Sequence, residues 1–346
     1  MSEAADIFLS AVHRVLRDHC ADWHKPQPVA WSPAAWSAIE SIGVPQALID
    51  EDRGGFGLAT AEALRFVRLA GLEGAPLPIG EAMLATSLLA RAGISPAAGA
   101  LTVALSGTFT LLEENGTYCL RGQCARVPWG RAADWVVVLA QSGDETAVIL
   151  TPSASLHWET GENLAGEPRD TLRADIGVSR DRVGTIAKVD ALAQKSLGAA
   201  LRCQGIAGAI ERTLTMTLQY AQDRKQFGRP IGRFQAIQHA LATAAGHAAA
   251  ADAAADMAAE AFAGSDWLPI AMAKSRCGES AGAVAAIAHQ VHGALGFSAE
   301  YPLHHYTKRL WAWREEHGSE SEWSERLGHA AFEAGPDGLW PLLTRT

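Results

Sequence analysis

A basic turn at residues 224–232 carries the clearest potential for binding chemistry in this sequence. It reads Arg-Lys-Gln-Phe-Gly-Arg-Pro-Ile-Gly, with two arginines and a lysine within six residues, and it separates two segments of helical periodicity. Guanidinium groups and the free backbone N–H donors of such a turn can bind one anion together. The turn suggests a site for a phosphate-bearing ligand, and a solvated helix–helix connection is the alternative on spacing alone.

A second break in the helical pattern falls at residues 290–297, Gln-Val-His-Gly-Ala-Leu-Gly-Phe, followed by Glu-Tyr-Pro at 300–302. It supplies an amide side chain and exposed backbone. His292 alone is more typical of a packed or solvated histidine than of a catalyst, and His304 and His305 are expected at the surface. Because no acidic residue stands at ligand spacing to these histidines, the sequence predicts no metal site.

Composition limits the classes of partner. The chain has 346 residues, 48% of them hydrophobic and 19% charged, and a net charge of -9, which is typical of a soluble globular protein and argues against nucleic acid as a ligand. Its five cysteines are scattered and form no Cys-x-x-Cys pair, so neither a disulfide framework nor a zinc site is indicated. With no membrane span and no signal peptide in the pattern, we expect a cytoplasmic protein.

The hydrophobic periodicity changes twice along the chain. Residues 1–100 have helical spacing, residues 101–186 contain short β-branched or aromatic runs separated by turn signals, and residues 187–346 are helical again. We therefore predict an N-terminal helical domain, a small central β domain and a C-terminal helical domain that carries both motifs. Trp129 and Trp135 are expected to fill the core or rim of the β domain.

The two motifs resemble signatures of the flavin-dependent acyl-CoA dehydrogenases. Residues 224–228 with Gln235 are similar to the family's Arg-x-x-Phe-Gly…Gln, and residues 290–302 are similar to its Gln-x-x-Gly-Gly-x-Gly…Glu-x-Pro. The resemblance covers nearly the whole chain. It implies a multidomain α and β fold: an N-terminal helical domain, a small β domain and a C-terminal four-helix bundle.

The resemblance also implies FAD as the cofactor. In the family the first motif reaches across a dimer interface to the FAD of the neighbouring subunit, and the second adds glutamine and backbone contacts. The residues assigned to FAD in this way are Arg224, Gln226, Phe227, Gln235, Gln290, Gly293 and Ala294. Ala294 stands where the family usually has glycine. This change retains a backbone contact to FAD but limits a closer approach of the backbone.

The family reaction is α,β-dehydrogenation of an acyl-CoA thioester, in which a glutamate takes the α-proton and the flavin takes the β-hydride. The family's glutamate position is His317 here, and the alternative position used by an isovaleryl-CoA dehydrogenase-like branch falls near Gly198. Glu316 through a one-residue shift, or His317 itself, are the candidate catalytic bases. The alternative is that both are structural or solvated.

The β domain is short and lacks the family's Gly-Ser-Asp and Trp-x-Thr/Ser segments that hold the flavin ring. This resembles the shorter acyl-CoA dehydrogenase subunits that assemble with a paralogue, as in steroid side-chain catabolism. We therefore expect a heterotetramer with a paralogous subunit, with a homo-oligomer as the alternative, and an electron-transferring flavoprotein as acceptor. A catalytically silent subunit that retains FAD, and a flavin monooxygenase on the same fold, are the other functions considered.

Overall fold

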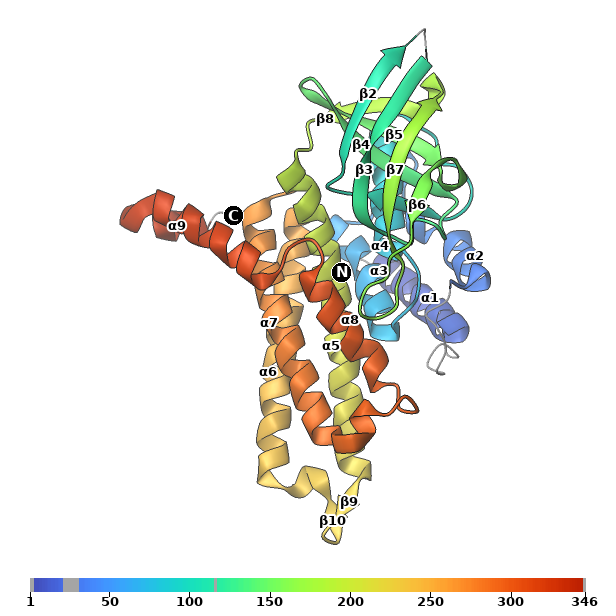
Figure 1. Cartoon of the computed structure of the whole chain (residues 1–346). Coiled ribbons are helices and arrows are strands. Elements are labelled where there is room, and N and C mark those ends of the chain that lie inside the picture. Colours follow the sequence, from blue (N-terminus) through green and yellow to red (C-terminus); the bar gives the residue numbers. More distant parts are fainter. Residues whose placement is uncertain (1–2, 21–30, 115–116, 345–346) are drawn as a thin grey trace.

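The structure is a computed structural model that describes residues 3–20, 31–114 and 117–344. It has three parts: a group of N-terminal helices, a twisted sheet beside them, and a long helical bundle that extends away from both (Figure 1). The predicted order of helical, β and helical parts is confirmed. The N-terminal helices are α1 (Glu3–Cys20), α2 (Pro33–Ser41), α3 (Thr60–Glu73) and α4 (Ile79–Arg91).

Local signals explain where these helices begin and end. The side chain of Ser32 accepts a hydrogen bond from the backbone N–H of Ala35 and caps α2, with proline at the first helical position. Gly43, with φ of 81°, turns the chain after α2 in a conformation that glycine adopts without strain. Trp36 and Ile39 of α2 are buried in a core shared with α3, α4 and the bundle.

The eight strands of the sheet lie in the order β6-β7-β3-β2-β4-β5-β8, and β1 pairs with β4 in parallel. Alternate side chains of β4 and β5 enter two different cores, one shared with the helices and one enclosed by the curved sheet. The strands are β1 (Leu101–Ala104), β2 (Thr108–Glu114), β3 (Thr117–Pro128), β4 (Trp135–Ser142), β5 (Glu145–Pro152), β6 (His157–Glu159), β7 (Arg169–Val178) and β8 (Val183–Ala187). Trp129, just after β3, is buried as expected, and Trp135 is half-buried.

The bundle consists of α5 (Ala191–Asp223), α6 (Gln235–Phe262), α7 (Trp267–His292) and α8 (Leu303–Glu315). Asp190 caps α5 by accepting a hydrogen bond from the N–H of Ala193 at 2.8 Å. Alanine-rich α6 packs closely against α5 and α7 because its side chains are small. At the end of the bundle far from the sheet, the short strands β9 (Lys225–Gln226) and β10 (Arg229–Pro230) form a hairpin (Figure 1).

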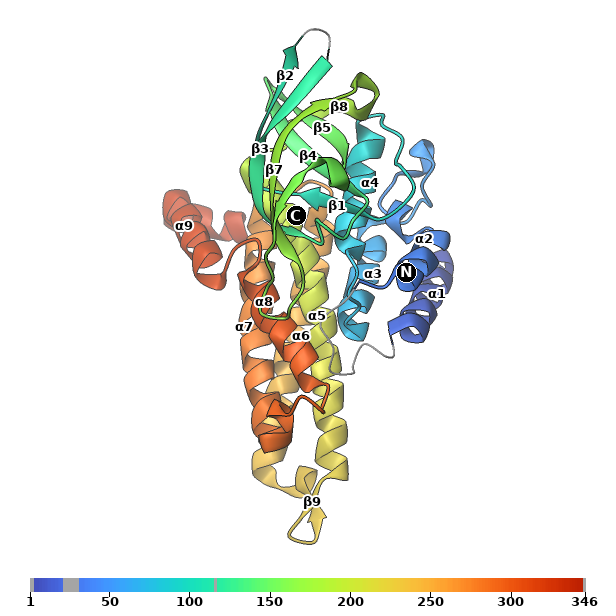
Figure 2. The ribbon, with the colours of Figure 1, turned by 45° about the vertical axis from the view of Figure 1, so that its right-hand side comes forward.

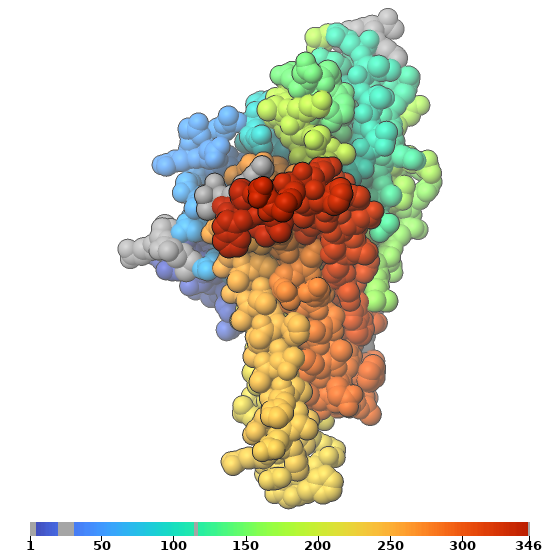
Figure 3. All heavy atoms as spheres, turned by 90° about the vertical axis from the view of Figure 1, so that its left-hand side faces the viewer, coloured from blue at the N-terminus to red at the C-terminus, as the bar shows by residue number. Residues whose placement is uncertain are grey.

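The last helix, α9 (Glu320–Leu343), projects from the side of the bundle (Figures 1 and 2). Figure 3 shows it lying across the molecule between the sheet and the lower part of the bundle. Gly335, with φ of 67°, interrupts its helical geometry. Phe332 is 88% exposed and Trp340 is 72% exposed, so this helix carries large apolar side chains on its surface. Within the described residues, no helix combines the length and apolarity that a membrane crossing requires.

Candidate functional site

The turn that follows α5 is a tight hairpin. Gln226 pairs with Arg229 and Lys225 with Pro230, which leaves Phe227 and Gly228 as the two loop residues. Both have positive φ, 51° and 79°, as a two-residue turn of this kind requires. Phe227 is 91% exposed, so the turn presents an aromatic ring to the outside rather than to its own core.

The cations of this turn differ in their surroundings. The guanidinium carbon of Arg229 lies 4.3 Å from the ring centroid of Phe234, a cation–π contact that holds the side chain against the turn. Arg224 is exposed and has no side-chain partner among the described residues. Gln226 and Gln235 are exposed as well. Arg224 is therefore available to an external anion, and Lys225 of the same turn is exposed as well.

The second motif lies at the end of α7. Gly293 ends this helix with φ of 59° and ψ of -139°, and nothing lies within 4 Å of the position of a Cβ. Gly293 and Ala294 begin a short 3-10 helix, Gly293–Phe297, and both are exposed, as is Gln290. The backbone of this motif is thus open to a ligand from outside.

Aromatic contacts join the two motifs at the same end of the bundle. The ring of Tyr220, in the last turn of α5, stacks on His292 with ring centroids 4.4 Å apart, and its hydroxyl donates to the carbonyl oxygen of His292 at 3.4 Å. Val291, Ala221 and Ile231 form a small apolar cluster beneath both motifs. The contact of Tyr220 with His292 spans 72 residues, so no local sequence signal predicts it.

The histidines near this end are packed, as expected for His292. Burial lowers the pKa of His292, whose Nδ1 lies 2.7 Å from the carbonyl oxygen of Ala288. His305 is buried rather than at the surface as predicted, because it faces the interior from α8 and lies beside His304 with ring centroids 4.0 Å apart. No group of three potential metal ligands comes together within the described part of the chain.

The two positions where the family's base is expected meet in space. The ring of His317, in the loop between α8 and α9, packs on Gly198 of α5 so closely that a Cβ on Gly198 would lie 2.3 Å from Nδ1. His317 has φ of 55°, and its carbonyl oxygen accepts a hydrogen bond from Trp323 Nε1 at 3.1 Å. Lys274 of α7 donates to the carbonyl oxygens of Arg314 and Gly318, at 2.6 and 2.8 Å, and so fixes both sides of the loop.

The carboxylate of Glu316 is enclosed by cations. Its Oε1 accepts from Arg169 Nε at 2.8 Å and from Asn163 Nδ2 at 2.9 Å, and its Oε2 accepts from Arg202 Nε at 2.6 Å. Burial opposes ionisation, but the guanidinium groups of Arg169 and Arg202 outweigh it and hold the pKa of Glu316 well below its usual range. The carboxylate is therefore ionised and fully engaged.

His317, unlike the ionised Glu316, is uncharged. Burial and the neighbouring Arg202 guanidinium lower the pKa of His317 to about 3, so the imidazole is neutral at physiological pH. A proton acceptor whose conjugate acid is this strong is a weak base for an α-carbon. The base roles of Glu316 and His317 stay predictions, and the geometry of both residues provides little support for them.

A cleft of about 330 Å³ lies between the sheet and the bundle at His317. Its sheet side is residues 125–128 of β3, where a register shift against β7 forms a bulge and Arg126 has φ of 57°. Arg126 is exposed, and Lys195 and Glu322 lie on the bundle side, where they form an ion pair.

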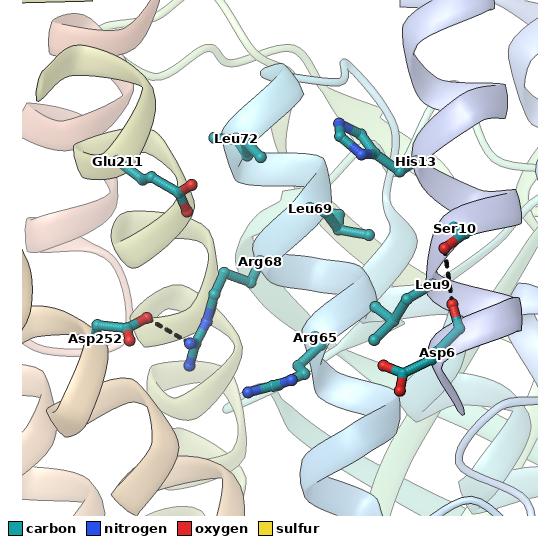
Figure 4. A pocket seen from close by; sticks show the side chains of 10 residues that line it. All are labelled: Asp6, Leu9, Ser10, His13, Arg65, Arg68, Leu69, Leu72, Glu211 and Asp252. Carbon is teal, nitrogen blue, oxygen red and sulfur yellow. Dashed lines mark hydrogen bonds and ion pairs between the residues drawn. The ribbon is translucent and has the colours of Figure 1, made fainter. Parts of the chain in front are cut away.

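A larger cavity of about 500 Å³ lies elsewhere, between α1, α3, α5 and α6, and contains none of the motif residues (Figure 4). Charged side chains dominate it, and Arg68 is bound by Asp252 and Asp256 at 2.5 Å each. Figure 4 shows Leu9, Leu69 and Leu72 forming its apolar part. Because Arg68 is already paired with two aspartates, its guanidinium group is not free to bind an external anion.

The fold and the paired motifs define an acyl-CoA dehydrogenase type of protein, and comparisons with known proteins agree. Residues 191–321 match the acyl-CoA dehydrogenase C-terminal domain family. The chain is 28% identical over 282 residues to the acyl-CoA dehydrogenase IpdE2 of Mycobacterium tuberculosis, which spans 81% of this chain and 80% of that protein. Residues 191–321 therefore form an acyl-CoA dehydrogenase C-terminal domain, and the chain as a whole is similar to acyl-CoA dehydrogenases.

Solved structures show the same fold. The ChsE4-ChsE5 complex from Mycobacterium tuberculosis matches with a TM-score of 0.84 at 24% identity, over 96% of this chain and 98% of that chain. The Tcur3481-Tcur3483 steroid ACAD, a G363A variant, matches with a TM-score of 0.82 at 22% identity, over 96% and 98%. At these identities the likeness concerns the fold alone.

Proposed function

We propose that this chain takes part in FAD-dependent α,β-dehydrogenation of an acyl-CoA thioester, as one subunit of a complex with a paralogous acyl-CoA dehydrogenase. The similarity to acyl-CoA dehydrogenases supports the oxidoreductase class. The two solved complexes of this fold that pair different chains support the heteromer. By the same likeness, we place steroid-derived acyl-CoA among the substrates, an electron-transferring flavoprotein as acceptor, and the complex in the cytoplasm.

The residues at the far end of the bundle fit the phosphate side of FAD. Arg224 is exposed and unpaired among the described residues, and the backbone at Gly293 is open on the side where a Cβ would stand. A guanidinium and backbone N–H groups are suitable donors for a pyrophosphate. Ala294 is exposed, so its methyl group leaves the backbone accessible. Gln226, Phe227, Gln235 and Gln290 of the two motifs are exposed as well.

Bound FAD would supply the hydride acceptor of the reaction. The chain's own residues would bind and orient it: Arg224 by charge, Gln290 through its amide, and Phe227 through its exposed ring. None of these side chains lies in the cleft at His317. The motifs at the bundle end are therefore suited to the FAD of a neighbouring subunit, and this chain contributes binding rather than proton transfer.

The observation that carries the heteromer is the state of the base position. Glu316 is held by Arg169 and Arg202, and His317 is a neutral imidazole with a weakly basic nitrogen. Neither is prepared to take an α-proton from a thioester. The same observation favours the second candidate function, a catalytically silent subunit that assembles with an active one and retains its FAD.

The test compares the chain purified alone with the chain purified together with a genetically adjacent paralogue. Flavin content is measured by absorbance, and dehydrogenation by anaerobic bleaching of the flavin on addition of acyl-CoA. We expect flavin and bleaching only in the pair. A fully active flavin homotetramer made of this chain alone would refute the heteromer.

The silent-subunit function is distinguished by testing the candidate base His317 within the pair. His317→Gln and Glu315→Gln are compared, the second being an exposed neighbour outside the proposed chemistry. Equal bleaching rates in both variants favour the silent subunit. A loss of bleaching confined to His317→Gln assigns the proton transfer to this chain.

A further inference from the structure

Six buried charges meet where the three parts of the molecule join. Three carboxylates and three guanidinium groups form this junction cluster, and all six residues are buried. Its members are Glu81 of α4, Glu167 and Arg169 at the loop between β6 and β7, Arg202 of α5, Arg309 of α8, and Glu316. In Figures 1 and 2 this loop extends from the sheet toward α8.

The hydrogen bonds of the junction cluster run without interruption from the N-terminal helices to α8. Arg202 donates to Glu81 Oε1 and to Glu316 Oε2, both at 2.6 Å. Arg169 donates to Glu316 and, through Nη2, to Glu167 at 2.9 Å. Arg309 Nε donates to Glu167 Oε1 at 2.9 Å, and Trp313 Nε1 donates to its Oε2 at 2.8 Å.

This cluster fills the space directly behind the base position. His317 follows Glu316 in the chain and rests on Gly198, one turn before Arg202 on α5. Beyond Arg202, toward α3 and α4, the remaining cavity measures about 40 Å³. A cavity that holds a single water needs roughly 10–15 Å³, and one that takes up benzene measures about 150 Å³. An acyl group of even a few carbons does not fit there.

An acyl group could enter this space only by displacing buried ions. Each ion of the cluster is matched by an opposite charge, and removing one partner leaves an uncompensated buried charge. The aliphatic side chains of Val67, Leu77 and Ile79 are therefore separated from His317 by these paired charges. Displacing one charged side chain would leave its partner unpaired. A thioester placed at His317 would have only the open, charged cleft for its acyl part.

We infer that the junction cluster closes the interior of this chain to the acyl group, so that the acyl-CoA oxidised by the complex is held by the paralogous subunit. This inference rests on the proposed function and adds to it a division of labour. The present chain would bind the phosphate side of FAD, and the partner would bind the acyl group. The loop between β6 and β7, through Glu167 and Arg169, is the determinant of that division.

The test uses the purified pair and an acyl-CoA that carries a photoreactive diazirine at the end of its acyl chain. After irradiation, labelled peptides are assigned to each subunit by mass spectrometry, with unlabelled acyl-CoA as competitor. We expect competed label on the partner, and at least tenfold less on this chain. Competed label on residues 63–81, 125–128 or 198–205 of this chain would overturn the inference.

A second measurement applies to the same pair with Gly80→Ala, which adds one methyl group to the wall of the remaining cavity, against Leu201 and Val67. If this space is closed to substrate, KM for acyl-CoA stays within twofold of the wild-type value. A tenfold or larger rise in KM would place the acyl group there and overturn the inference.

The control for Gly80→Ala is Gly246→Ala, on the exposed side of α6, where nothing lies within 4 Å of an added Cβ. Failure of the proposed function gives a different result from failure of this inference. It appears as a pair without flavin or without bleaching by acyl-CoA. Failure of the inference appears as an active pair whose label or KM change falls on this chain.

Discussion

Replacing Glu316 by glutamine tests directly whether this carboxylate is a structural ion or a free catalytic group. The substitution keeps the shape of the side chain and removes its charge. In the folded chain Glu316 accepts hydrogen bonds from Arg169, Arg202 and Asn163, at 2.6 to 2.9 Å. Glutamine can still accept at one oxygen, but its amide nitrogen would face a guanidinium donor, and two buried cations would lose their shared counter-charge.

The expected cost follows from that geometry. Breaking a buried ion pair by removing one partner destabilises a protein by about 3–5 kcal/mol, because the remaining charge is left uncompensated. Glu316 serves two cations, so we expect Glu316→Gln to lose at least the lower end of that range. Urea unfolding followed by circular dichroism measures the free energy of unfolding, and an unchanged urea slope would confirm that the two variants unfold from comparable states.

The matched control is Glu315→Gln, one residue earlier, whose side chain is 60% exposed and lies 3.8 Å from Arg314. An exposed pair of this kind contributes little, so the control should change stability by no more than about 0.5 kcal/mol. If Glu316→Gln were as mild as its neighbour, the carboxylate would not be held as a structural ion. That result would support the role of Glu316 as a catalytic base.

Three further predictions concern the same residues and the FAD motif. The pKa of Glu316 is lower in the folded chain than its unfolded value of about 4.3. The ionised carboxylate therefore stabilises the fold above that pH, and this contribution declines below it by up to about 1.4 kcal/mol per pH unit. The difference in unfolding free energy between the wild type and Glu316→Gln should shrink between pH 7 and pH 3. Arg224→Ala should weaken the binding of FAD to the pair by about 1.5–3 kcal/mol, as measured by fluorescence titration. If its FAD affinity equals that of the exposed control variant Arg326→Ala, Arg224 makes no charged contact with FAD. Gly198→Ala should destabilise the chain by about 1–3 kcal/mol, because the added methyl group clashes with the His317 ring. In the double variant, His317→Gly should remove that cost. Additive effects of the two substitutions in thermal unfolding would contradict a contact between these residues.

The helical and β parts could be predicted from the sequence because their signals are local. The β-branched runs at 135–139 and 147–150 became β4 and β5, and the glycine-marked breaks at 228 and 293 became a hairpin and a helix end. Each depends on residues within one or two turns of chain. The FAD assignment also needed the resemblance to the family, because the spacing of residues around an exposed arginine in a turn does not identify its ligand.

The junction cluster could not have been predicted in the same way. Glu81, Arg202 and Glu316 are separated by more than a hundred residues at each step, and no periodicity connects them. The sequence did mark both Gly198 and His317 as base positions, but as alternatives. The His317 imidazole occupies the space next to Gly198 because the α8–α9 loop packs on α5, and the sequence has no signal for this packing.

The apolar surface of α9 has a consequence for how this chain is produced. Phe332 and Trp340 are large side chains left in contact with water, and apolar surface of this kind promotes self-association as concentration rises. A chain synthesised in excess of whatever covers this helix would be the species most exposed to chaperones and proteases.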